Sequence, residues 1–152
     1  MTGWWVALAT LALGTVIGVV RLRRDGRVRD TGDTGEDRLS GAELGVGLGE
    51  RATLVQFSTA FCQPCRATRR ILADVSELVP GVSHVEIDAE SRLDLVRRLD
   101  IMRTPTVLVL DAGGRIVKRA AGQPRKADVL AALAAAVPPP PSQESSHQPD
   151  EM

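Results

Sequence analysis

The two cysteines of this 152-residue chain, Cys62 and Cys65, lie three positions apart. They follow an apolar run, residues 52–59, whose length and β-branched content predict a buried strand. A pattern of apolar residues at helical spacing then extends to residue 79 and predicts a helix that starts at the pair. A cysteine pair at such a junction is compatible with three kinds of site: half of a metal site, a structural disulfide, or a redox centre.

The other residues of the chain allow these three alternatives to be weighed. A structural zinc site generally takes four ligands, but the chain has no third cysteine and only two histidines, His84 and His147. A disulfide that closes so small a loop removes little entropy from the unfolded chain. We therefore favour the redox centre, and expect no metal and no cofactor beyond the Cys62–Cys65 disulfide itself.

The position of the pair at a helix N-terminus supports redox chemistry. Free N–H groups and the helix dipole stabilise a thiolate there, and the thiolate is the attacking species. We expect Cys62 to attack a substrate disulfide and Cys65, one turn later, to resolve the mixed disulfide. Pro64 fits the first turn, where its missing N–H costs little.

Periodic patterns continue through residues 39–137, which we predict to be one domain. The expected elements are a strand at 52–59, a helix at 62–79, a strand at 82–88, a helix at 91–100, strands at 106–110 and 115–121, and a helix at 124–137. Strand–helix–strand order indicates parallel pairing, whereas the hairpin around "DAGG" adds an antiparallel pair. The prediction is an α/β fold with a mixed central sheet flanked by helices.

Residues 3–20 carry no charge and are apolar on every face, which sets them apart from this domain. Eighteen helical residues span about 27 Å, close to the hydrocarbon thickness of a bilayer. Trp4 and Trp5 fit the membrane interface, and no basic region precedes the run as a cleaved signal peptide would require. We favour a single uncleaved transmembrane anchor in residues 1–20 over a signal peptide or a buried helix, with the lipid membrane as a partner.

The arginines that follow the apolar run indicate its orientation. Positive residues that flank a span tend to stay in the cytoplasm, so we expect the catalytic domain on the cytoplasmic side. The extracytoplasmic face remains the alternative, because long domains translocate largely regardless of charge. The cluster consists of Arg21, Arg23, Arg24, Arg27 and Arg29.

The segments on either side of the domain are polar. Residues 21–38 are read as a flexible linker with an r.m.s. reach of about 25 Å, and residues 138–152, which begin with four prolines, as a disordered tail. Nineteen basic and nineteen acidic residues balance, which gives no electrostatic reason to expect nucleic acid as a partner.

Three stretches, "LVQFSTAFCQPCR", "VEIDAE" and "IMRTPTVLVLDAGGRIVKRAAG", resemble the thioredoxin family over residues 39–137. The resemblance implies a thioredoxin-like fold, a cis bond before Pro105 beside the cysteine pair, and pairing of the Thr104 backbone with a bound substrate. Gly122 matches a glycine that lets a partner approach closely. The expected substrate-contacting residues are Phe61, Gln63, Pro64, Thr104, Pro105 and Gly122.

The chain also departs from the family pattern. Thioredoxins commonly have Trp where this chain has Phe61, and Gly-Pro where it has Gln63-Pro64. A buried aspartate that helps to move the proton of the second cysteine is replaced by Gln56, which cannot accept a proton at neutral pH. We hypothesise that Cys65 relies on water or on His84 for deprotonation; the alternative for His84 is an ordinary strand residue.

The resemblance implies a thiol-disulfide oxidoreductase, most simply a protein-disulfide reductase, and the apolar run at residues 3–20 adds a membrane tether. Its partners would be protein disulfides and an external dithiol donor, since no glycine-rich nucleotide-binding motif is present. Two alternatives stay open. One is an extracytoplasmic thioredoxin-like reductase for cytochrome maturation or disulfide correction; the other is a non-catalytic docking module with this fold.

Overall fold

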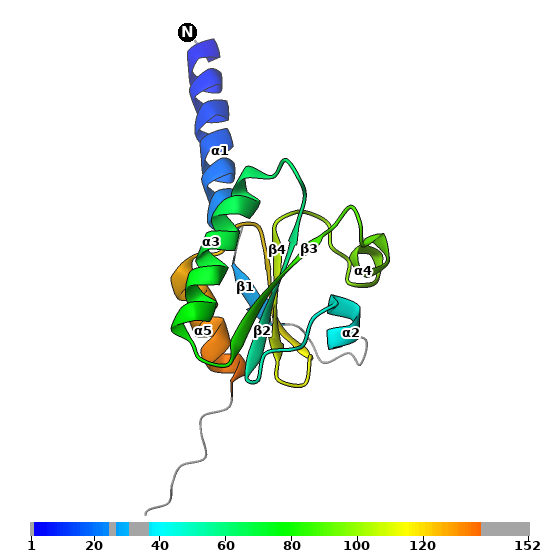
Figure 1. Ribbon diagram of the computed structural model, residues 1–152. Helices are drawn as coiled ribbons and strands as arrows, with labels where there is room; N and C mark the ends of the chain where they lie inside the picture. The colour runs from blue at the N-terminus through cyan, green and yellow to red at the C-terminus, as the bar shows by residue number, and fades with distance from the viewer. Residues whose placement is uncertain (1, 25–26, 31–36, 138–152) are drawn as a thin grey trace, which may run out of the picture.

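The computed structural model describes residues 2–24, 27–30 and 37–137, and joins a long N-terminal helix to a sheet covered by helices (Figure 1). The elements are α1 (Thr2–Arg24), β1 (Val28–Asp30), α2 (Gly41–Leu44), β2 (Ala52–Ser58), α3 (Gln63–Leu78), β3 (Val82–Asp88), α4 (Leu93–Arg98), β4 (Thr106–Asp111), β5 (Ile116–Ala121) and α5 (Lys126–Ala136). Within α1, Gly3–Arg21 is long and apolar enough to cross a membrane, and no part of it is buried against the domain.

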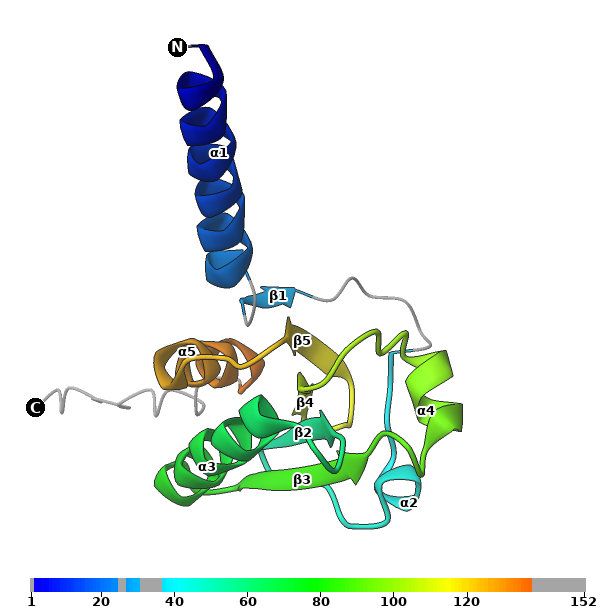
Figure 2. The same ribbon diagram turned by 90° about the horizontal axis from the view of Figure 1, so that it is seen from above.

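Within the described residues, the sheet has five strands in the order β1-β5-β4-β2-β3. β2 and β3 are parallel, and the other neighbouring pairs are antiparallel. Figure 2 shows α3 and α5 on one face of the sheet and α2 and α4 on the other. The mixed α/β fold expected from the sequence is therefore confirmed, and each predicted element between residues 52 and 137 is present within a few residues of its expected bounds.

In the part of the chain that the structure describes, the core consists of two apolar clusters, one on each face of the sheet. Leu54, Leu72 and Leu133 belong to the cluster under α3 and α5, whereas Phe57 and Leu95 belong to the cluster under α2 and α4. Every residue of β2 is buried because this central strand is covered on both faces. That burial explains why the sequence of β2 is a continuous apolar run. It also holds β2, the strand that leads into the cysteine loop, firmly in the core.

The N-terminal part of the chain differs from expectation in two places. α1 continues past residue 20 to Arg24, and β1 lies inside the segment 21–38 that was expected to be a flexible linker. β1 is only three residues long and has one apolar residue, Val28, so its local sequence gives no strand signal; the open edge of β5 supplies its pairing. The remaining linker residues, 25–26 and 31–36, and the tail 138–152 lie outside the described residues.

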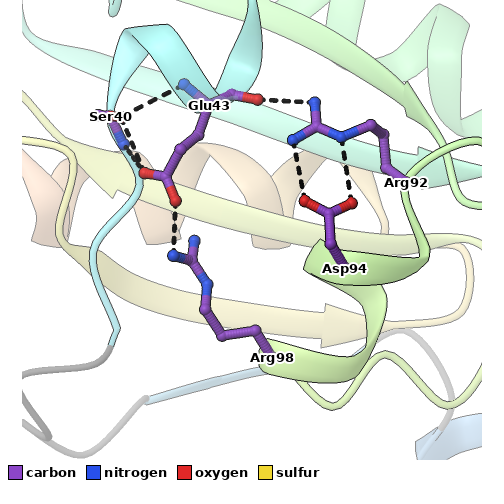
Figure 3. A network of polar contacts seen from close by, with 5 residues as sticks. All are labelled: Ser40, Glu43, Arg92, Asp94 and Arg98. Carbon is purple, nitrogen blue, oxygen red and sulfur yellow. Dashed lines mark hydrogen bonds and ion pairs between the residues drawn. The ribbon is translucent and has the colours of Figure 1, made fainter.

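The short helix α2, also absent from the sequence prediction, is held by the polar network of Figure 3. The Glu43 N–H donates to Ser40 Oγ (3.3 Å) while the Ser40 N–H donates to Glu43 Oε2 (2.8 Å), which forms a capping box. The Ser40 N–H bond and the neighbouring Arg98 hold the pKa of Glu43 below its usual range. Arg92 Nη1 donates to the Glu43 carbonyl (2.8 Å), so α2 is fastened to the region of α4.

Candidate redox site

The cysteine pair lies where β2 ends and α3 begins. Cys62 is the N-cap of α3, and the Cys65 N–H donates to its sulfur at 3.2 Å. The two sulfurs form a disulfide with an S–S distance of 2.08 Å. Cys62 is half-buried whereas Cys65 is buried, so Cys62 presents the sulfur that a partner can reach. Once the disulfide opens, the same N–H group and the helix dipole favour a thiolate at Cys62.

The loop before β4 lies beside the cysteine loop. The Cys62 N–H donates to the Thr59 carbonyl (3.3 Å), and the hydroxyls of Thr59 and Thr104 are 3.3 Å apart. The Thr104–Pro105 peptide bond is cis, in agreement with the expectation from the sequence. The Gly122 N–H donates to the Pro105 carbonyl at 2.7 Å. The structure therefore brings Thr104, Pro105 and Gly122 to the same end of the sheet as the cysteines.

The backbone conformation at position 122 requires glycine. Its φ angle is +94°, in the region that side chains with a Cβ rarely adopt. This conformation turns the chain directly after β5, where its N–H meets Pro105. Gly122 thus shapes the backbone beside the cis proline.

Two large apolar side chains are exposed in the cysteine loop and in the loop before β4. Phe61 is 96% exposed and Met102 83% exposed, although both are large and hydrophobic. Gln63 and Pro64 are also exposed, in the first turn of α3. Phe61 and the Gln63-Pro64 pair were expected to contact substrate, whereas Met102 carried no sequence signal beyond its position near Thr104-Pro105.

A cavity of about 330 Å³ adjoins the disulfide on the side of β3. Both cysteines line it, together with Glu86, Asp88 and Arg69. Arg69 Nε and Glu86 Oε2 form an ion pair at 2.7 Å. Burial raises the pKa of Glu86, but hydrogen bonds from Arg69 and Ser58 outweigh it and hold this pKa below its usual range. Sequence reasoning missed Glu86, because its approach to the site depends on the pairing of β2 with β3.

Gln56 lies directly beneath the second cysteine. Its side chain is fully buried, and Nε2 donates to the Cys65 carbonyl (2.8 Å) and to Ser58 Oγ (2.9 Å). Its Oε1 is buried and has no hydrogen-bond partner among the described residues. Gln56 therefore anchors the first turn of α3 through its amide, and it offers Cys65 no ionisable group.

His84 lies farther from the cysteines than Glu86 does. In the parallel pairing of β2 and β3, His84 is opposite Leu54 whereas Glu86 is opposite Gln56. Glu86 is therefore two residues nearer than His84 to the end of the strands where the cysteine loop begins. His84 is not among the residues that line the cavity. Burial lowers its pKa, Arg69 adds to that effect, and Glu86 opposes it. The structure thus places Glu86, and not His84, beside the cysteine pair.

The lowered pKa of His84 predicts a pH-dependent stability. Its ordinary pKa is 6.5, and in the folded chain it is lower, so the unfolded chain binds the proton more tightly. We expect the free energy of unfolding to fall as pH drops from about 6.5 through the folded pKa, and this loss to disappear in His84→Val. Urea titrations followed by far-UV circular dichroism at a series of pH values measure it. Parallel pH profiles for both proteins would show that His84 does not titrate in this way.

Among the described residues, no group of three or more His, Cys, Asp or Glu side chains is placed to hold a metal ion. The chemistry that the site offers is that of two cysteines, one reachable and one buried, on a helix N-terminus.

Comparison with known proteins places this arrangement in a family. The family model described as Thioredoxin matches residues 45–136, more than half of the chain. Thioredoxin H4-1 of Oryza sativa subsp. japonica is 32% identical over 85 residues, which cover 55% of this chain and 65% of that protein. Thioredoxin of Alicyclobacillus acidocaldarius is 32% identical over 87 residues, which cover 57% of this chain and 82% of that protein.

Solved structures agree on the fold. A mutant thioredoxin from Halobacterium salinarum superposes with a TM-score of 0.54 at 15% identity, over 60% of this chain and 80% of that one. The long form of thioredoxin f from spinach chloroplast gives 0.52 at 24% identity, over 58% and 72%. The chain spans only part of the curated relatives that it matches: 65% of Thioredoxin H4-1, and 45% and 53% of two others. On the family model, the cysteine pair and the fold, this chain belongs to the thioredoxin family.

Proposed function

We propose that the chain is a thiol-disulfide oxidoreductase that reduces protein disulfides and is tethered to a membrane by α1. The Cys62–Cys65 disulfide at the N-terminus of α3 is the observation that carries the proposal. The half-buried Cys62 and the buried Cys65 suit an attacking and a resolving role respectively. The exposed apolar side chains around it suit contact with an extended segment of another protein.

The reaction balances as a two-electron exchange. In the reduced chain, the Cys62 thiolate attacks one sulfur of the substrate disulfide; the Cys62–substrate bond forms, and the other substrate sulfur leaves as a thiolate. The Cys65 thiolate then attacks Cys62 Sγ, closes the Cys62–Cys65 disulfide and releases the second substrate thiolate. The substrate is reduced to a dithiol and the chain is oxidised. A dithiol donor protein regenerates the pair by the reverse exchange.

The proton of Cys65 must leave before the second step. Gln56 holds the Cys65 backbone but cannot accept the proton, and His84 lies away from the cavity. We propose that the proton leaves through water in the cavity, which Glu86 and Asp88 also line. The second step is therefore expected to be slower than it would be with an ionisable group at position 56.

Gln56→Asp is expected to accelerate the resolution of the mixed disulfide at neutral pH by at least about 10-fold, because it supplies a general base under Cys65. Gln56→Asn is the matched control, since it has the same size as Asp without the ionisable group. Rapid quenching with acid and separation of the mixed disulfide measure the rate. An Asp variant that resolves no faster than the Asn variant would refute the role assigned to position 56.

The arginines after the span support a cytoplasmic domain. Brief reduction of intact cells, followed by a membrane-impermeant maleimide, tests this orientation. Labelling of Cys62 only after permeabilisation is the expected result. Labelling in intact cells would place the domain on the outer face and favour an extracytoplasmic reductase.

Reduction of insulin by the full-length chain in detergent, with dithiothreitol as donor, tests the activity itself. We expect catalytic turnover that disappears when both cysteines are replaced by serine. A docking module with this fold would give no turnover with either protein.

A further inference from the structure

The strand pairing of β1 shows at which end the chain enters the domain. β1 is antiparallel to β5, with Val28 opposite Ala120. Ala120 is opposite Val107 in β4, and Val107 is opposite Gln56 in β2. Val28 therefore lies in the same row across the sheet as Gln56, whose amide donates to the Cys65 carbonyl.

The direction of β1 then fixes where the anchor joins. β5 runs toward Gly122, so antiparallel β1 runs away from it, and Arg27, directly before Val28, lies on the side of the sheet end that carries Gly122 and Pro105. We call this end the catalytic edge; it carries Cys62, Pro105 and Gly122. Figure 1 shows α1 projecting from the domain at the end of the sheet where α3 begins.

The connection between helix and strand is short. α1 ends at Arg24 and β1 begins at Val28, so four Cα–Cα steps separate them. A fully extended chain advances at most about 3.5 Å per residue, which limits the separation to about 14 Å. A flexible linker of the whole segment 21–38 would have reached about 25 Å r.m.s.. Pairing of β1 with β5 thus shortens the tether between α1 and the domain and attaches it at the catalytic edge of the sheet.

Lateral distances on the catalytic edge are also short. β1 and β2 are separated by β5 and β4, which is three strand spacings or about 14 Å. The anchor and the cysteine loop therefore leave the sheet at the same end, and three strand spacings separate them. Val28 packs against the apolar cluster under α3 and α5, which adds a side-chain contact to the backbone pairing.

We propose that the catalytic edge is held close to the membrane surface, and that the substrates are disulfides of integral membrane proteins located next to the bilayer. This inference rests on the proposed function, because it needs both the anchor and the disulfide exchange. Phe61 and Met102, both strongly exposed and apolar, lie beside Cys62 and shortly before Pro105. They suit a partner that approaches through the membrane interface, and the short tether gives the edge a high effective concentration there.

The test uses the full-length chain in vesicles of phosphatidylcholine and phosphatidylglycerol, with two probes. One is a self-quenched fluorescent peptide disulfide attached to a phospholipid headgroup by a short spacer; the other is the same disulfide without lipid. The quantity of interest is the ratio of the rate on the lipid probe to the rate on the soluble probe. The lipid probe is added to preformed vesicles so that it occupies only the outer leaflet. Only domains that face the outside then act on either probe, so the ratio is independent of how many chains insert in each orientation.

Two insertions of the same Gly-Ser segment distinguish tether length from other effects. A segment of about twelve residues placed between residues 26 and 27 adds roughly 20 Å of r.m.s. reach between anchor and β1. The same segment between residues 33 and 34 lies after β1 and leaves the tether unchanged. We expect the first insertion to lower the ratio about 5-fold or more and the second to leave it at the wild-type value.

The outcomes separate the inference from the function on which it rests. Equal rates on the soluble probe in all three proteins show that the domain is folded and active. A ratio that neither insertion changes would overturn the membrane-facing edge and leave the reductase function standing. A wild-type chain that reduces neither probe would overturn the proposed function and the inference together.

Discussion

Replacing Cys65 by serine is expected to convert the chain into a covalent trap for its substrates. Cys62 still attacks, but a serine hydroxyl cannot displace the substrate from the mixed disulfide. Turnover is expected to fall by on the order of 10³-fold or more, while a stable adduct accumulates in stoichiometric amount. Incubation of the reduced variant with oxidised insulin, followed by electrophoresis without reductant, measures the adduct as a mass shift that dithiothreitol removes.

Cys62→Ser is the matched control for the trap. It retains the buried Cys65, which is 2% exposed and is not placed to attack a protein disulfide. We expect the same loss of turnover but no adduct. Equal adduct formation by the two single variants would contradict the assignment of Cys62 as the attacking residue.

The second large effect concerns the core. Phe57 is completely buried in the middle of the sheet, in the cluster that α4 covers. Phe57→Ala removes a buried ring and leaves a cavity, and we expect it to lower the free energy of unfolding by about 3–5 kcal/mol. That is a large part of the roughly 5–15 kcal/mol of a typical domain. Both tryptophans lie in α1, so urea unfolding is best followed by far-UV circular dichroism.

Phe61 provides the control, because it is the other phenylalanine of the chain and is 96% exposed. Phe61→Ala is expected to change the free energy of unfolding by less than about 0.5 kcal/mol, as surface substitutions usually do. Comparable losses for the two variants would mean that the burial of Phe57 does not govern the stability of the domain.

Elements with a strong local pattern were predictable from the sequence. β2 is a continuous apolar run because it is buried on both faces, and α3 shows apolar spacing from its first turn to Leu78. β1 and α2 are three and four residues long, too short for a period to emerge. They depend on partners distant in sequence: β1 on the edge of β5, and α2 on Arg92 and Arg98.

Some residues of the candidate site were predictable from the sequence and others were not. The cysteine pair, Pro105 and the unusual Gln56 could be located from the sequence, since each stands at a fixed place in a motif. Glu86 could not, because only the register of β2 against β3 shows that it stands opposite Gln56 while His84 lies one repeat farther away. Its ion pair with Arg69 joins residues seventeen positions apart, on different elements.

Cys62 and Cys65 are expected to form a reversible dithiol–disulfide couple in the folded chain. The direct measurement equilibrates the native full-length protein in buffers of graded reduced-to-oxidised dithiothreitol ratio, quenches the exchange with acid, and then labels the free thiols in denaturant with a maleimide that adds mass, because Cys65 is buried in the native chain. We predict a single transition in which both thiols are labelled together. Its slope is that of a two-electron couple, for which a tenfold change in the reduced-to-oxidised ratio corresponds to about 30 mV in potential. A stable population with one labelled cysteine, or a pair that stays oxidised at every ratio unless the chain is unfolded before equilibration, would contradict the claim.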